Sequence, residues 1–196
     1  MRKVQIFLSR WRVRLGHIFA LVLLFFAKPD AVSLIAGSVL AVIGEMFRVF
    51  AAGYIDKDEI LSRAGPYAWT RNPLYFGSFV LYLGFCIAGR NPYIIALYFP
   101  FFFVVYFSTI LLEEKFLTEK FGDEFKSYTA SVPRFFPRLN LRTSAPPHLG
   151  TSAPPQFYWE KVMKNREYEG VLGLIIVLIL LILEFCFRFS PYRLIF

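Results

Sequence analysis

Five apolar runs separated by short polar segments constrain the fold of this chain more than any other feature. They lie at about 15–27, 31–52, 73–89, 92–112 and 171–187. A helix needs about 20 apolar residues to cross a bilayer, and most of these runs approach that length. A soluble domain of 196 residues cannot bury a composition that is 57% hydrophobic, whereas lipid solvates apolar side chains directly. The sequence therefore predicts an all-α integral membrane bundle of about five transmembrane helices with a cytoplasmic amphipathic helix.

The turns between the runs contain recognisable helix signals. Asp30 follows a Lys-Pro pair and is a plausible N-cap for the second helix. The first run is short, so its helix is expected to begin before residue 15, with its arginines reaching toward the interface. The link at 89–91 is too short for anything but an antiparallel hairpin. Pro100 is expected to kink the fourth helix.

The net charge of +8 bears on partners and on orientation. Its basic residues lie between apolar runs and form no stripe, which argues against a nucleic-acid partner. Most of them fall in 1–14, 53–72 and 113–170. Because cytoplasmic segments of membrane proteins are enriched in Lys and Arg, we predict a cytoplasmic N-terminus and a C-terminus on the opposite side.

The chain divides into three regions. Residues 1–142 form the predicted membrane domain, and 143–156 form a Thr/Ser/Ala/Pro linker containing a short repeat. Residues 157–196 add a C-terminal segment with a further transmembrane helix. Within the first region, 113–142 has amphipathic spacing and is expected to form one helix that ends at Pro133. Its apolar face is made by Leu117, Phe121, Phe125 and Tyr128.

Two charged pairs lie within apolar runs. Glu45 and Arg48 are three apart on one helix face and could form an ion pair. They could be interfacial side chains or the polar lining of an active-site mouth. Glu184 and Arg188 are four apart in the last run. The two cysteines, Cys86 and Cys186, lie in apolar runs and are expected to be buried thiols.

The first segment that could carry chemistry lies at the start of the third apolar run. Asn72-Pro73 is typical of an N-cap followed by proline at the first helical position. A helix N-terminus attracts anions, and Arg71 beside it adds a positive charge. The site would suit a carboxylate or a phosphate. Asn91-Pro92 repeats the dipeptide on the other side of the membrane, so helix initiation alone is an alternative interpretation.

The second segment is Glu113-Glu114, where the fourth run ends. Adjacent carboxylates at a bilayer edge repel each other and are costly to desolvate. They could bind ribose hydroxyls, an ammonium or a metal, or simply begin a solvated surface helix. Only His17 and His148 are present in the chain, so no metal site is expected. Arg134 could be a fixed cation or an anchor for lipid phosphate.

Taken in order, these segments resemble one family. The pattern is Gly65-Pro66-Tyr67, Arg71-Asn72-Pro73-Leu74-Tyr75-Phe76-Gly77, a helical hairpin, Glu113-Glu114, Phe121-Gly122, Tyr128 and Val132-Pro133-Arg134-Phe135-Phe136-Pro137. It is similar to the superfamily of isoprenylcysteine carboxyl methyltransferases and phospholipid methyltransferases over residues 65–137. The resemblance implies a bacterial inner-membrane enzyme that uses S-adenosylmethionine at the cytoplasmic face. Its acceptor would be a lipid or a prenylated group.

Site residues follow from the resemblance by position. Candidate catalytic residues are Arg71, Glu114 and Arg134, and candidate cofactor contacts are Tyr67, Asn72, Pro73, Tyr75, Gly77, Glu113, Glu114 and Tyr128. Asn72 stands where eukaryotic members have histidine, and an asparagine cannot act as a general base. A carboxylate acceptor would need no base.

Two other functions remain open from the sequence. One is an NADPH-dependent membrane reductase of the sterol reductase type, which would need further basic residues for the 2′-phosphate. The other is a non-enzymatic membrane subunit or small-molecule carrier. Binding of NADPH or of S-adenosylmethionine, and methyl incorporation into a lipid extract, would distinguish them.

Overall fold

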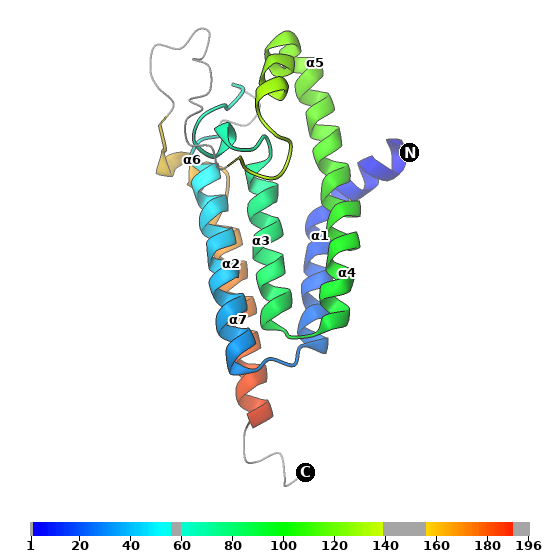
Figure 1. The fold of residues 1–196 in the computed structure, drawn as a ribbon, viewed down its shortest axis with the longest axis vertical. Helices are drawn as coiled ribbons and strands as arrows, with labels where there is room; N and C mark the ends of the chain where they lie inside the picture. Colours follow the sequence, from blue (N-terminus) through cyan, green and yellow to red (C-terminus); the bar gives the residue numbers. More distant parts are fainter. Residues whose placement is uncertain (1, 56–59, 139–155, 190–196) are drawn as a thin grey trace.

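The computed structural model describes residues 2–55, 60–138 and 156–189, and every regular element in these ranges is helical. This confirms the all-α prediction (Figure 1). The elements are α1 (Arg2–Phe26), α2 (Ala31–Ala52), the 3₁₀ turn η1 (Gly65–Ala68), α3 (Pro73–Ala88), α4 (Pro92–Phe102), the π-helical segment η2 (Phe103–Phe107), α5 (Ser108–Ser131), α6 (Trp159–Lys164) and α7 (Tyr168–Phe189).

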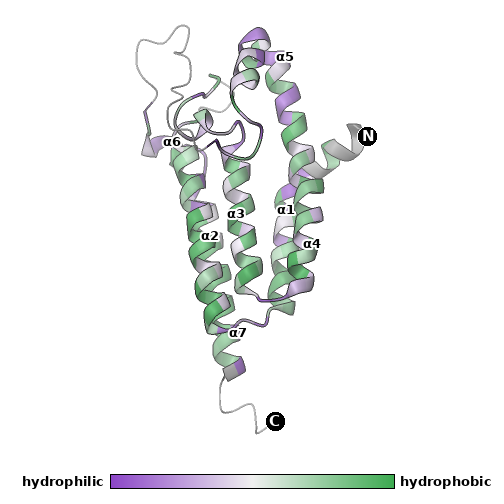
Figure 2. Ribbon diagram, viewed as in Figure 1, coloured by the Kyte–Doolittle hydropathy of each residue, from purple (hydrophilic) through white to green (hydrophobic). Residues whose placement is uncertain are grey.

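The long helices run up and down, so alternate connections meet at the same end of the bundle (Figure 1). The turns at 27–30 and 89–91 lie at one end. We call the other end, with residues 60–72, 113–138 and 156–167, the polar end. Figure 2 shows hydrophilic residues gathered there and hydrophobic ones along the helices between. The predicted antiparallel hairpin of α3 and α4 is confirmed.

Three helical stretches are long and apolar enough to cross a membrane by length and composition. They are Ala31–Ala52, Pro92–Ser131 and Tyr168–Arg188, and the apolar helix Pro73–Ala88 is shorter. Large apolar side chains such as Phe25, Val32 and Phe187 are more than 70% exposed on the outside of the bundle. Exposing such side chains to water is unfavourable in free energy, whereas lipid tails solvate them.

The three helix starts expected to be capped differ in the role of their side chains. Asp30 accepts from the Ser33 amide at 2.7 Å and forms a capping box, and Asn91 accepts from the Tyr93 amide at 3.0 Å. Asn72 occupies the N-cap position of α3, but its side chain makes no cap hydrogen bond. The prediction of a side-chain cap by Asn72 is therefore wrong, because that amide is used elsewhere.

Helices α2 and α3 pack backbone to backbone through glycines spaced seven residues apart. A Cβ atom on Gly44 would lie 2.4 Å from the Leu81 nitrogen, and one on Gly84 would lie 2.4 Å from the Ala41 nitrogen. Small residues allow this close approach in membrane bundles. The contact fixes the start of α3 relative to the end of α2 at the polar end.

Pro100, where the sequence predicts a kink, lies inside the fourth apolar run. Helix α4 passes through Pro100, and the wider π-helical turn of η2 follows and leads into α5. The single amphipathic helix predicted for 113–142 is wrong in one respect. Gly122 is non-helical, with φ 53° and ψ −123°, so the chain folds back there and α5 ends at Ser131.

The fold-back at Gly122 brings the predicted apolar face into a small second core. Leu61, Phe125, Tyr128 and Val132 are buried in this cluster, and Leu117 and Phe121 pack against it. A straight helix would have left most of this face without a partner. The cluster covers the polar end of the bundle and positions residues 132–138 beside α3.

Replacing Gly122 by alanine is expected to destabilise this fold-back. An L-residue is strained at φ 53° and ψ −123°, at a cost of about 1–3 kcal/mol. A Cβ atom there would meet no described heavy atom within 4 Å, so crowding would not contribute. Faster proteolysis near residue 122 in Gly122→Ala would reveal the loosened segment. An unchanged cleavage rate and melting temperature would contradict it.

The two cysteines differ in exposure. Cys86 is buried as expected, but Cys186 is exposed, because it lies on the outward face of α7. Glu184 and Arg188 approach to 3.6 Å. The predicted linker 143–156 lies outside the described residues except for Gln156.

Candidate functional site

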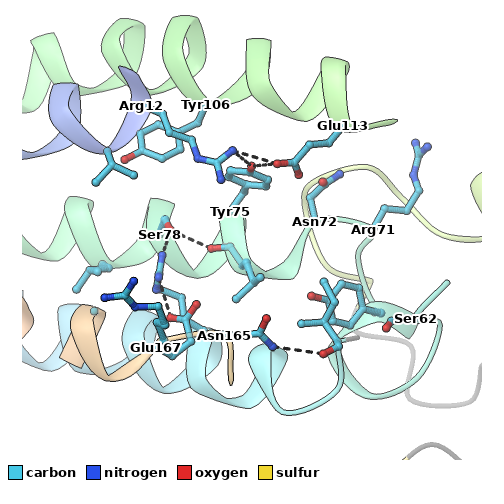
Figure 3. A pocket seen from close by; sticks show the side chains of 18 of the residues that line it. Arg12, Ser62, Arg71, Asn72, Tyr75, Ser78, Tyr106, Glu113, Asn165 and Glu167 are labelled. Carbon is cyan, nitrogen blue, oxygen red and sulfur yellow. Dashed lines mark hydrogen bonds and ion pairs between the residues drawn. The ribbon is translucent and has the colours of Figure 1, made fainter. Parts of the chain in front are cut away.

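A cavity of about 720 Å³ opens at the polar end and continues between the helices. Its walls come from α1, α2, α3, α5 and the start of α7, together with η1 and the segment before it. Figure 3 shows its polar side chains converging from segments far apart in the sequence. The start of α3 and the residues where α5 leaves the bundle meet here, as the sequence predicts.

Glu113 lies on the wall between α1 and α3. Its Oε1 accepts a hydrogen bond from Tyr75 Oη at 2.6 Å and from Arg12 Nη1 at 3.0 Å. Arg12 also donates to Tyr75 Oη at 3.0 Å, which closes a three-membered network (Figure 3). The Glu113 side chain is 45% exposed, so this carboxylate remains accessible to a ligand.

Glu114 lies in a separate cluster on the other side of α5. Its carboxylate pairs with Arg71 Nη1 at 3.2 Å and with Arg134 Nε at 2.9 Å. Asn72 Nδ2 donates to the Arg134 carbonyl at 2.9 Å and approaches Glu114 Oε1 at 3.4 Å. The asparagine amide therefore joins α3 to the segment after α5, which explains why it does not cap α3.

The two adjacent glutamates separate because successive residues on an α-helix point about 100° apart. One carboxylate faces α1 and the other faces the segment at 132–138. Burial lowers the pKa of the Arg71 guanidinium below its ordinary value, and Glu114 opposes that shift. Glu114 thus lies between two cations and holds both in place.

Tyr67 contributes an unpaired buried hydroxyl to the cavity wall. The residue is 6% exposed, and within the described part of the chain its Oη has no hydrogen-bond partner. Its backbone carbonyl accepts from Tyr128 Oη at 2.6 Å, which fixes its position. Burial raises the pKa of Tyr67 well above its ordinary value, so the hydroxyl remains a donor. Buried polar atoms without partners are rare and call for an explanation.

A third charged cluster joins α2 to the start of α7. The predicted Glu45–Arg48 ion pair is confirmed, with 3.2 Å between Arg48 Nε and Glu45 Oε2. Arg48 Nη2 also pairs with Glu167 at 2.8 Å, and Nη1 donates to Ser78. Arg48, Ser78 and Glu167 line the cavity. Asn165 donates to the Ala52 carbonyl at 3.1 Å, so α7 is held to α2 at several points.

The sequence-predicted site residues fall into two groups. Those that line the cavity are Tyr67, Arg71, Asn72, Tyr75, Glu113, Glu114 and Tyr128. The others do not line it. Arg134 contacts Glu114, and Gly77 faces α2, where its Cβ would lie 2.6 Å from Arg48 Cγ. Pro73 is buried at the start of α3 and is not part of the lining.

Other lining residues were not expected from the sequence. Arg12 belongs to the basic N-terminal segment, whose charge is explained by membrane orientation alone. Glu167 is 119 residues from its partner Arg48, so no local spacing indicates the pair. Only the position of Arg48 inside an apolar run signals a polar function.

The deeper part of the cavity is apolar. Its lining there includes Leu81 and Phe85 on α3, Leu174 and Val177 on α7 and Ala20 on α1. These residues lie more than one and a half turns from the helix ends at the polar end, so they mark the interior of the bundle. Within the described ranges, no group of three or more His, Cys, Asp or Glu side chains could hold a metal ion.

Three known proteins are similar in sequence to this chain. The cobalt-zinc-cadmium resistance protein CzcN of Cupriavidus metallidurans is 30% identical over 71% of this chain and 70% of that protein. The nickel-cobalt-cadmium resistance protein NccN of Alcaligenes xylosoxydans xylosoxydans is 33% identical over 58% of this chain and 52% of that protein. The protein-S-isoprenylcysteine O-methyltransferase of Schizosaccharomyces pombe is 33% identical over 49% of this chain and 41% of that protein.

No solved structure matches this chain. Residues 15–124, more than half of the chain, match the family described as phospholipid methyltransferase. The matched region runs from α1 into α5 and contains η1, the start of α3 and both glutamates, whereas Arg12, Tyr128 and Arg134 lie outside it. The chain belongs to the phospholipid methyltransferase family, and it is related at low identity to the isoprenylcysteine O-methyltransferases.

Proposed function

We propose that this protein transfers a methyl group from S-adenosylmethionine to a lipid-borne or membrane-soluble acceptor, a carboxylate or an amine. Family membership and the isoprenylcysteine O-methyltransferase relatives support the reaction class. The observation that carries the proposal is the cavity at the polar end, which combines fixed charges of both signs with an apolar interior.

The polar wall fits the cofactor. S-adenosylmethionine carries a carboxylate, an ammonium, a sulfonium and two ribose hydroxyls. Arg71 beside the start of α3 suits the carboxylate, and the accessible oxygens of Glu113 suit the ammonium or the ribose. The unpaired Tyr67 hydroxyl supplies a hydrogen-bond donor that no described protein group uses. We assign Glu114 and Arg134 a supporting role, because Glu114 pairs with and orients Arg71, and Arg134 pairs with Glu114.

When bound, S-adenosylmethionine would supply an activated methyl group on a cationic sulfur for transfer to the acceptor. The protein's contribution is then positioning. Glu113 and Arg12 hold Tyr75 in the cavity wall through its hydroxyl, and the Arg12 guanidinium lies over the Tyr75 ring, 5.8 Å from its centroid. Asn72 donates its amide to protein groups and accepts no proton, so an acceptor carboxylate, which needs no base, fits best.

The proposal includes an orientation in the membrane. The polar end carries most of the basic residues, so we place it at the cytoplasmic face of a bacterial inner membrane. The N-terminus then lies in the cytoplasm and the described end of α7 on the opposite side. In this arrangement α1 and the short α3 cross together with the three longer spans. Five helices cross in all.

Replacing Tyr67 by phenylalanine is expected to weaken S-adenosylmethionine binding about five- to tenfold, since one hydrogen bond contributes about 1 kcal/mol. The substitution leaves the protein without a new unpaired group, so the fold should be unaffected. Titration calorimetry on detergent-purified protein measures the change. Tyr93→Phe is the matched control, because Tyr93 is 83% exposed at the opposite end. Absence of any binding to the unaltered protein would refute the proposed activity.

A non-enzymatic membrane subunit is the second candidate. It is favoured by one observation: the match to CzcN, which is named a metal-resistance protein, covers more of this chain than the match to the yeast methyltransferase. Such a subunit would incorporate no methyl label into a lipid extract. A parallel titration with NADPH separates both candidates from a reductase.

A further inference from the structure

The cavity reaches the surface of the bundle between α1 and α7. Val13 and His17 on α1 and Gly173 on α7 all line it, and all three are exposed. The two helices are in contact elsewhere along their lengths. The opening therefore lies on the side of the bundle, beside apolar residues, and leads toward the buried Leu81 and Phe85.

Gly173 has no packing reason to be glycine. Glycine inside a helix costs about 1 kcal/mol relative to alanine, and packing normally explains it. At Gly170 it does, because a Cβ atom there would lie 2.5 Å from Glu45 Oε1. At Gly173 a Cβ atom would meet no described heavy atom within 4 Å. The missing side chain leaves space in the cavity wall.

The position of Gly173 relative to the cavity is fixed. Glu167 pairs with Arg48 at 2.8 Å, and Asn165 donates to the Ala52 and Ile55 carbonyls at 3.1 and 3.3 Å. These contacts hold the start of α7 against α2. Gly173 lies about one and a half turns further along the helix. The opening is thus a built feature of the bundle.

We propose that Gly173 is a specificity-determining residue, which keeps the α1–α7 opening wide enough for the hydrocarbon chain of a membrane-borne acceptor. This inference rests on the proposed methyltransferase function. A cavity of about 720 Å³ lies within the range of roughly 300–1,000 Å³ that holds one drug-sized ligand. It can take a nucleoside and the reacting end of an acceptor. The rest of the chain then remains in the lipid outside the opening.

The test compares Gly173→Phe with the control Ile176→Phe in native membranes. The control places the same aromatic ring on the outward face of α7, where Ile176 is 56% exposed. Each protein receives S-adenosylmethionine labelled in the methyl group, and label in the organic extract is counted. Cofactor affinity is measured by calorimetry on the same proteins in detergent. Gly173→Leu repeats the test with a flexible side chain.

We expect Gly173→Phe to reduce extractable label by about tenfold or more while cofactor affinity stays within about twofold, because acceptor positioning alone is changed. The Ile176→Phe control should match the unaltered protein. Undiminished label in Gly173→Phe and Gly173→Leu would overturn the inference. So would a parallel loss of cofactor binding, which would place Gly173 in the cofactor part of the cavity. If the unaltered protein bound the cofactor but produced no extractable label, the inference about Gly173 would be overturned while the proposed cofactor site would stand. If the unaltered protein bound no cofactor at all, the proposed function itself would be refuted.

Discussion

Glu114→Gln is expected to weaken S-adenosylmethionine binding by roughly 30- to 100-fold, or about 2–3 kcal/mol. The carboxylate holds Arg71 at 3.2 Å and Arg134 at 2.9 Å. A neutral amide of the same shape would leave two neighbouring cations without their shared anion. Arg71 would then lose its fixed orientation beside the start of α3. Titration calorimetry with purified protein measures the effect.

The matched control for this prediction is Glu119→Gln on the same helix. Its side chain is 66% exposed and lies 3.9 Å from Lys115, a surface pair that contributes little. Melting temperatures of both variants separate a binding defect from unfolding. If Glu114→Gln retained normal cofactor affinity, the cluster of Arg71, Asn72 and Arg134 would have no part in the site.

Gly44→Ala is expected to destabilise the bundle by about 3 kcal/mol, at the upper end of the range for overpacking. The new Cβ atom would lie 2.4 Å from the Leu81 nitrogen and 2.8 Å from the Gly77 carbonyl oxygen. Both are backbone atoms, so no side-chain rotation relieves the contact. Helices α2 and α3 would have to separate, which would also displace Arg48 from Ser78.

Thermal unfolding can be followed by the exposure of Cys86, which is 1% exposed in the folded protein. A thiol-reactive dye reports it in a Cys186→Ala background, since Cys186 is accessible before unfolding. Gly173→Ala is the control, because the same methyl group there meets open space. Equal unfolding temperatures for Gly44→Ala and Gly173→Ala would show that α2 and α3 do not pack as described.

The features that the sequence predicts correctly are local. Apolar runs and their polar boundaries are read within about 20 residues, and the structure places helices on all five runs. Asp30 and Asn91 cap their helices because a cap needs only the next two or three amides. The i,i+3 pair of Glu45 and Arg48 is local for the same reason. Successive helices also cross in opposite directions, so the start of α3 and the end of the fourth run lie at the same end of the bundle.

Tertiary structure alone decides which partners the polar groups find. Asn72 and Asn91 share the same dipeptide, yet only Asn91 caps its helix, because Arg134 and Glu114 lie within reach of Asn72. Glu113 and Glu114 are neighbours in the chain and still enter different networks, since the helix turns one away from the other. Arg12 and Glu167 pair with residues 101 and 119 positions away in the sequence, Glu113 and Arg48 respectively. Helical periodicity relates only residues a few positions apart, so it cannot predict these pairs. Gly77 likewise packs against α2 instead of lining the cavity. No local motif predicts this contact, because every side chain in the interface of two helices contributes to the distance between them.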